Sequence, residues 1–128
     1  RRKEKSVAHQ VVHFEIPAED VQRAVQFYSR LFGWEMEEAP GYPDYYMFDS
    51  SGGQELQGGA VQKRQPGMES PVNYISVESV SQMVGRIREL GGEILMDKSP
   101  VPGMGWIAIF HDTEGNTFGL WENDPSAA

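Results

Sequence analysis

Apolar and polar side chains alternate in the first patterned stretch of the chain. Between residues 11 and 16 the apolar side chains share one face, whereas His13 and Glu15 share the other. This period of two predicts a strand with one face on a core. The pattern then changes to that of an amphipathic helix over residues 21–32, with Asp20 as its N-cap and Gly33 as its C-terminal stop.

The same patterns predict seven more strands and one more helix. The strands are expected at residues 34–37, 45–49, 55–62, 72–77, 93–96, 106–111 and 117–122. The second helix begins after Ser79, which has capping-box spacing to Gln82, and ends at Gly91 and Gly92. Residues 99–105 are rich in proline and glycine, which suits either a lid over a binding site or a plain hairpin connection.

The chain repeats its own pattern once, about 59 residues further on. Val21 matches Val80, and Gly33 matches Gly92, without a gap between these positions. A repeat of this length indicates two copies of one supersecondary unit. The predicted fold class is therefore α+β, with two βαβββ repeats that form a curved eight-stranded cup and helices outside.

The length of 128 residues suits one domain with a single core. We expect a single domain over residues 10–123. This domain contains repeat one (10–62), a linker (63–70) and repeat two (71–123). We expect a flexible N-terminal tail (1–9) before it and a second tail (124–128) after it.

Charge and composition narrow the classes of partner. The net charge is −8, from 11 basic and 19 acidic residues, which disfavours nucleic acid and anionic membrane surfaces. The absence of cysteine fits a reducing compartment, so we expect a cytoplasmic location. No apolar run approaches the length of a membrane-spanning helix.

Two groups of motifs resemble a known superfamily. The first half carries His13-x6-Asp20-Val21, Phe27-Tyr28 and Phe32-Gly33-Trp34, and the second half carries Ile87-x2-Leu90-Gly91-Gly92 and Phe110-x-Asp112-x2-Gly115-Asn116-x-Phe118-Gly119-Leu120. Together they resemble the vicinal oxygen chelate superfamily, which contains glyoxalases, bleomycin-resistance proteins and extradiol dioxygenases. Within it, residues 100–105 and 112–116 are similar to the lactoylglutathione lyase-related proteins. The resemblance is more specific for fold than for function, because one scaffold here serves lyases, dioxygenases, epimerases, hydrolases and binding proteins.

The resemblance also implies four metal-ligand positions in the cup. Aligned onto this chain, they fall at His13, Gln57, Val72 and Gly119. Valine and glycine have no side-chain donor, so the standard ligand set is incomplete. We therefore expect no tightly bound cofactor, and the alternative is a weak divalent metal held by His13, Gln57 and Glu55.

His13 and Glu15 form the candidate catalytic pair. A histidine beside a carboxylate can act as a general base near neutral pH. The alternative is a half-exposed histidine and a solvated glutamate in a pocket wall. We expect His111 to lie at a strand end or turn, and His9 to lie in the N-terminal tail.

A group of mostly aromatic side chains is expected to line the cup as ligand contacts. The expected set is Tyr46, Phe48, Gln57, Tyr74, Trp106, Phe110 and Trp121. Ile107 and Ile109 are expected to face the helix instead. Aromatic walls with a few polar points are typical of small-molecule pockets. The alternative is that these rings pack against one another or against a second subunit.

These observations predict a glyoxalase-like protein that binds a small organic ligand and forms a homodimer. One alternative is a lyase or isomerase that uses His13, either with a weak metal or as a base. Another is a non-catalytic regulatory subunit.

Overall fold

The computed structural model describes residues 9–49 and 58–128 of the chain. Its elements are β1 (Val11–Ala18), α1 (Val21–Phe32), β2 (Glu37–Glu38), β3 (Tyr46–Asp49), β4 (Gly58–Lys63), β5 (Val72–Ser76), α2 (Val80–Glu89), β6 (Glu93–Val101), β7 (Gly105–His111) and β8 (Thr117–Asn123). This order is βαβββ twice, as the repeat predicts.

The chain divides into two compact units. The described residues of the N-terminal unit are 12–49 and 58–73, and those of the C-terminal unit are 74–128 together with 9–11. The backbone amide of Ser76 donates to the carbonyl of Gln10 at 2.9 Å, which ties the start of β1 to the C-terminal unit. The boundary between the units therefore differs from that between the expected repeats.

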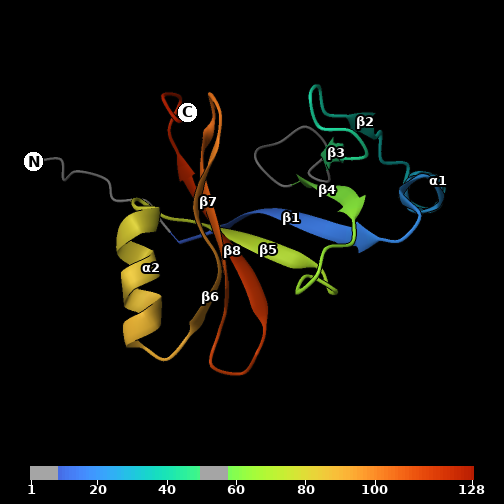
Figure 1. Cartoon of the computed structure of the whole chain (residues 1–128). Helices are drawn as coiled ribbons and strands as arrows, with labels where there is room; N and C mark the ends of the chain where they lie inside the picture. The colour runs from blue at the N-terminus through green and yellow to red at the C-terminus, as the bar shows by residue number, and fades with distance from the viewer. Residues whose placement is uncertain (1–8, 50–57) are drawn as a thin grey trace, which may run out of the picture. The chain divides into compact units, whose positions relative to one another are not determined.

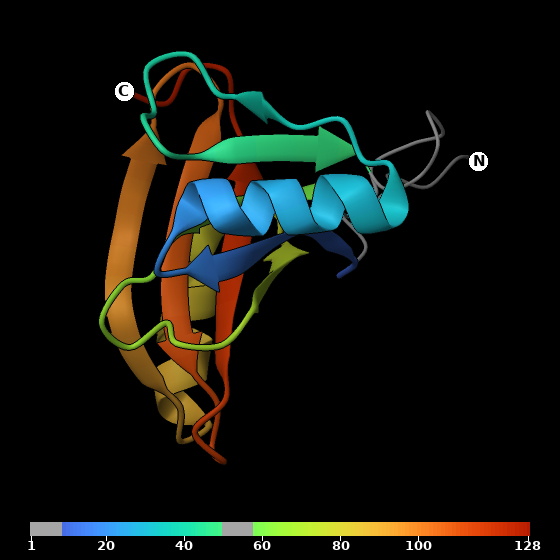
Figure 2. The ribbon, with the colours of Figure 1, turned by 90° about the vertical axis from the view of Figure 1, so that its right-hand side faces the viewer.

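The N-terminal unit is a sheet with the order β2-β3-β4-β1 and α1 on one face (Figure 2). β1 runs parallel to β4, and the other pairs are antiparallel. The side chain of Asp20 accepts from the amide of Arg23 at 3.0 Å, and Gly33 ends the helix at a φ of 74°. Both predicted caps are confirmed. The buried core of this unit is Ala18, Val21, Phe48 and Val61.

The C-terminal unit has strands in the order β5-β8-β7-β6, with α2 alongside β6 (Figure 1). Ser79 caps α2 as predicted, because its hydroxyl accepts from the amide of Gln82 at 3.1 Å. Glu122 on β8 accepts from the amide of Val80 at 2.9 Å and so ties the start of α2 to the sheet. The buried core here is Val77, Val80, Val84, Ala108 and Leu120.

Two strands predicted in the N-terminal unit have wrong boundaries. β1 runs through Pro17 to Ala18, because the parallel pairing with β4 continues to the end of β4. β2 contains only two residues, and the expected strand start at Trp34 is a core side chain whose ring stacks on Phe48 at 4.4 Å. The start of the expected strand 55–62 lies outside the described residues, and its described part belongs to β4 (Gly58–Lys63).

Residues 99–105 were expected to form either a lid or a plain hairpin connection, and strand pairing in the C-terminal unit distinguishes the two. Ser99 pairs with Ile107 and Val101 with Gly105, so β6 and β7 form a hairpin with a short turn. A hairpin connection, and not a lid, is what the structure contains. Residues 124–128, expected as a tail, pack onto this hairpin: Gly103 donates to the carbonyl of Ala127, which is itself buried.

Among the described residues, neither helix has the length and apolar character that a membrane crossing would require.

Candidate functional site

The N-terminal sheet has one face that carries polar side chains. Phe14 and Ile16 pack with α1, so His13 and Glu15, which alternate with them, lie on the opposite face of β1. Glu15 is aligned with Ala60 in β4, and Gln62 lies two residues further along the same face. Neighbouring strands therefore bring side chains from distant parts of the chain to one surface.

Four residues on this surface form a hydrogen-bonded group, which we call the polar cluster: His13, Glu15, Tyr45 and Gln62. The Nε2 atom of His13 lies 2.8 Å from the hydroxyl of Tyr45. That hydroxyl donates to Oε2 of Glu15 at 2.5 Å, and the side-chain amide of Gln62 donates to Oε1 at 3.0 Å. His13 Nε2 and Glu15 Oε2 are 3.7 Å apart.

Burial distinguishes the two candidate catalytic residues. Glu15 is 7% exposed and is the one buried polar residue among those described. Burying a carboxylate is costly unless its oxygens are hydrogen-bonded, and here both oxygens accept. The His13 side chain keeps 25% of its exposure. Glu15 is thus an anchored group, whereas His13 can still be approached from solvent, and the expectation of a solvated glutamate is wrong.

Tyr46 and Phe48, expected on the same face as His13, lie on the other face of the sheet. Phe48 is buried in the core against α1, with its ring edge-on to Phe14. The hydroxyl of Tyr46 accepts a hydrogen bond of 2.8 Å from Gln22 on α1. The side chains that we expected on the His13 face of β3 are on its α1 face instead. Tyr45, and not Tyr46, lies on the His13 face.

The C-terminal unit places two of the four expected aromatics on the face away from α2. The ring of Tyr74 lies directly over Gly119, where an added Cβ would meet ring atoms at 2.4 Å. Leu120 belongs to the core against α2, so its neighbours Gly119 and Trp121 point to the other face. Tyr74 and Trp121 therefore share a face, as predicted.

Trp106 and Phe110 face α2, and their expected place on the opposite face is wrong. Both pack against the core of the C-terminal unit, on the same side of β7 as Ala108. The indole of Trp106 donates to Asp124 at 2.9 Å, and Lys98 lies 4.4 Å from the centre of its ring. Ile107 and Ile109, which we expected to face the helix, occupy the other side of β7 by the same alternation.

The four implied metal-ligand positions do not fit a metal where the structure describes them. Val72 is buried and has no donor atom, and Gly119 is covered by the ring of Tyr74. Nε2 of His13 bonds to a phenol hydroxyl. Gln57 and Glu55 lie outside the described residues. Over residues 9–49 and 58–128, no three histidine, aspartate or glutamate side chains come together as a metal site would require.

The other two histidines are not among the four residues of the polar cluster. His111 ends β7 in the C-terminal unit, with Nδ1 3.5 Å from a carboxylate oxygen of Glu93. His9 is exposed before β1. The position of His111 at a strand end and that of His9 before β1 both agree with the predictions.

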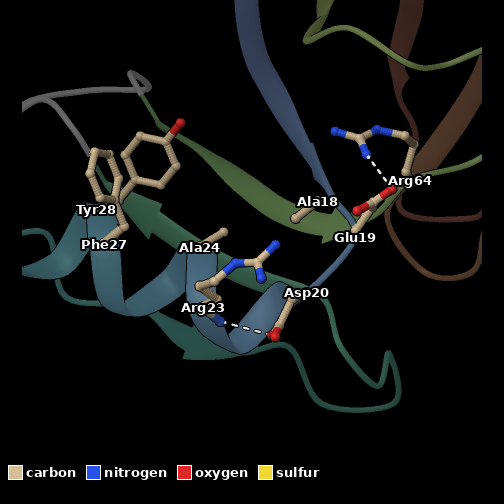
Figure 3. Close-up of a pocket in the computed structure, with 8 residues that line it drawn as sticks. All are labelled: Ala18, Glu19, Asp20, Arg23, Ala24, Phe27, Tyr28 and Arg64. Carbon is tan, nitrogen blue, oxygen red and sulfur yellow. Dashed lines mark hydrogen bonds and ion pairs between the residues drawn. The ribbon is translucent and has the colours of Figure 1, made fainter.

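A separate shallow hollow of about 350 Å³ opens beside the start of α1 (Figure 3). Its lining residues are Ala18, Glu19, Asp20, Arg23, Ala24, Phe27, Tyr28 and Arg64. Ala18 belongs to the core on the α1 side of the sheet, so this hollow lies on the face opposite the polar cluster. The lining contains two arginines and two carboxylates, and Nη1 of Arg64 lies 3.6 Å from Oε2 of Glu19, so the formal charges of the hollow cancel.

Comparisons with known proteins identify the family. The sequence model of the Glyoxalase/Bleomycin resistance protein/Dioxygenase superfamily matches residues 10–120. The chain belongs to this superfamily. The resemblance carried by the sequence motifs is thereby confirmed.

Relatives and solved structures agree with this assignment. A glyoxylase-like domain-containing protein of Didymella fabae is 35% identical over 118 residues, which cover 87% of this chain and 91% of that protein. The anthracycline biosynthesis protein DnrV of Streptomyces peucetius is 28% identical, and the match covers 84% of this chain and 45% of DnrV. The crystal structure of methylmalonyl-CoA epimerase from Mycobacterium tuberculosis has a TM-score of 0.66 at 16% identity, over 93% of each chain. This likeness confirms the glyoxalase-like α+β fold.

Sequence reasoning missed two members of the polar cluster in this glyoxalase-like chain. Tyr45 precedes β3 by one residue, and only the pairing of Met47 with Ala60 shows which face it shares. Gln62 lies next to the expected linker, but its even spacing from Ala60 would have placed it with Glu15 once the parallel register was known. The missing signal in both cases was the register between strands.

Proposed function

We propose that this glyoxalase-like chain binds a small organic ligand at the polar cluster, without a tightly held metal. The observation that carries the proposal is that hydrogen bonds from Tyr45 and Gln62 fix the position of the buried Glu15 carboxylate. Binding sites hold a few polar groups in fixed positions beside apolar surface. Met47, which is 43% exposed, supplies apolar surface on the same face. Tyr74 and Trp121 remain proposed ligand contacts of the C-terminal unit.

A ligand screen with two matched histidine variants tests this proposal. His13 and His111 are both strand residues with side chains 25% exposed and a carboxylate within 4 Å. The screen uses small aromatic and oxygen-rich compounds and includes an anthracycline, because one relative is named for anthracycline biosynthesis. Binding is followed by protein NMR and calorimetry.

We expect a ligand whose affinity falls at least about tenfold, or about 1.4 kcal/mol, in His13→Ala and changes little in His111→Ala. Equal losses in the two variants, or ligand-induced shifts that avoid the polar cluster, would refute this location of the site.

The absence of a tightly held metal is tested separately. Protein purified without chelators is analysed by elemental mass spectrometry and then titrated with Ni, Zn, Mn and Fe(II). We expect no tight equivalent, because the described ligand positions lack donors. One tight equivalent that disappears in His13→Ala would instead support a divalent metal held by His13, Gln57 and Glu55.

A second candidate is a lyase or isomerase in which His13 moves a proton without a metal. The favouring observation is that a third group orients the histidine, since Tyr45 links it to Glu15. Such an enzyme would exchange a carbon-bound hydrogen of its substrate with deuterium from the solvent. The exchange should survive chelators and vanish in His13→Ala, whereas a binding protein shows no exchange at all.

We further propose that the protein is a cytoplasmic homodimer that binds neither nucleic acid nor membranes. The support is a net charge of −8, the lack of cysteine and the pairing tendency of sheet edges. Light scattering coupled to size-exclusion chromatography measures the mass directly. A monomer at micromolar concentration contradicts the dimer.

A further inference from the structure

The hydrogen bonds of the polar cluster have a direction that follows from counting protons. A phenol hydroxyl has one hydrogen to donate, and Tyr45 donates it in a hydrogen bond to Oε2 of Glu15. The same oxygen of Tyr45 lies 2.8 Å from Nε2 of His13. Because the single hydrogen of the Tyr45 hydroxyl is used in the bond to Glu15, the hydroxyl oxygen can only accept from the His13 ring, so Nε2 must carry a hydrogen.

Gln62 fixes the other end of this chain of hydrogen bonds. Its side-chain amide donates to Oε1 of Glu15 at 3.0 Å, which leaves Oε2 as the oxygen that faces Tyr45. Glu15 is buried, so its carboxylate cannot turn toward bulk water without losing these partners. The order of donors therefore runs from His13 through Tyr45 to Glu15, and from Gln62 to Glu15.

We propose that Tyr45 and Gln62 are positioning residues, which act through Glu15 to hold His13 in the tautomer with hydrogen on Nε2 and the lone pair on Nδ1. The tautomer decides whether a histidine atom donates to a ligand or accepts from it. This inference deepens the proposed function, since it states which ring atom of His13 is the acceptor at the site.

The decisive experiment is ¹⁵N NMR of the histidine rings in the ligand-free protein at about pH 9, where free imidazole is neutral. Protonated and unprotonated ring nitrogens give separate signals, so the tautomer is read directly. Wild-type protein should show at least about a tenfold excess of the Nε2–H form of His13. An unconstrained imidazole also favours this form, so a variant must reverse the preference.

Glu15→Gln is that variant. Gln62 donates toward residue 15, so the new amide presents its oxygen to Gln62 and its NH₂ group to Tyr45. Tyr45 then accepts from the amide and donates to His13, and the Nδ1–H form should predominate. The double variant Glu15→Gln with Gln62→Glu turns the amide round again and should restore the Nε2–H form.

Two variants complete the test. Tyr45→Phe breaks the link, so adding Glu15→Gln to it should leave the tautomer ratio unchanged. Tyr42→Phe is the matched control, because Tyr42 is exposed and its ring lies 6.4 Å from that of Tyr45. It should leave the His13 signals where they are.

The proposal is overturned if folded Glu15→Gln keeps the Nε2–H form, or if the double variant fails to restore it. Should Glu15→Gln not fold, Tyr45→Phe decides alone, since the Nε2–H proton must lose its protection from exchange with solvent. No ligand is present in these experiments, so their failure is distinct from a failure of the proposed ligand binding.

Discussion

Replacing Gly119 with alanine tests the close packing of the C-terminal unit. An added Cβ would lie 2.4 Å from two ring atoms of Tyr74, whereas ordinary contact begins near 3.4 Å, so the ring must retreat by about 1 Å. Tyr74 is only 5% exposed and cannot simply swing into solvent. Overpacking of this kind costs about 1–3 kcal/mol.

The expected loss can be converted into a melting temperature. For 128 residues the unfolding entropy is about 270 cal/mol/K, so each kcal/mol corresponds to about 4 °C. We therefore expect Gly119→Ala to lower the melting temperature by about 4–11 °C. Scanning calorimetry and urea denaturation of the purified protein measure the change.

A double-mutant cycle with Tyr74→Ala isolates the contact. Once the ring is removed, the added methyl group has space, so most of the cost of Gly119→Ala should disappear. The matched control is Gly85→Ala, because an added Cβ at this helical glycine meets nothing within 4 Å. If Gly119→Ala costs the same in both backgrounds, the ring is not the cause and the reasoning is refuted.

The remaining predictions concern caps and turns. Gly85→Ala should stabilise the protein by up to about 1 kcal/mol in urea denaturation, because alanine is the better helix former, and a loss would contradict open space at this position. Ser79→Ala should cost about 0.5–2 kcal/mol through the lost bond to the Gln82 amide, with Ser79→Asn as the retaining control. Hydrogen bonds from the backbone and side chain of Asn116 lower the pKa of Asp112 in the folded protein. The ionised carboxylate of Asp112 therefore stabilises the folded state above about pH 4, and this stabilisation is lost as the pH falls through the folded pKa. The urea concentration at the unfolding midpoint should therefore fall more steeply from pH 7 to pH 3 in wild type than in Asp112→Asn. Parallel midpoint curves for the two proteins would show that Asp112 does not cause the loss of stability at low pH.

The elements of this chain were predictable because their signals are local. The Asp20 and Ser79 caps and the Gly33 stop lie within one helical turn of the backbone groups that they satisfy. The turn before β8 likewise needs only Asp112 and Asn116, whose backbone and side chains bond each other. Such interactions depend on residues a few positions apart, so the amino-acid sequence is enough to predict them.

Strand faces were predictable only where one side of the strand is polar. His13 and Glu15 alternate with apolar neighbours, and their shared face was predicted correctly. Trp106 to Phe110 are apolar at every position, so periodicity cannot say which residues face α2, and the chosen alternation was wrong. At the start of β3, Tyr45 and Tyr46 are adjacent and chemically alike, and a shift of one residue exchanged their roles.

The sequence alone therefore determined the repeat, the family, the helix caps and the pairing of His13 with Glu15 on one strand face. Only the tertiary structure decided that Tyr45 and Gln62 complete the polar cluster, since they lie 30 and 47 residues from Glu15. Contacts over such separations depend on the register in which strands pair. That register is decided by burial of whole faces and not by any local pattern.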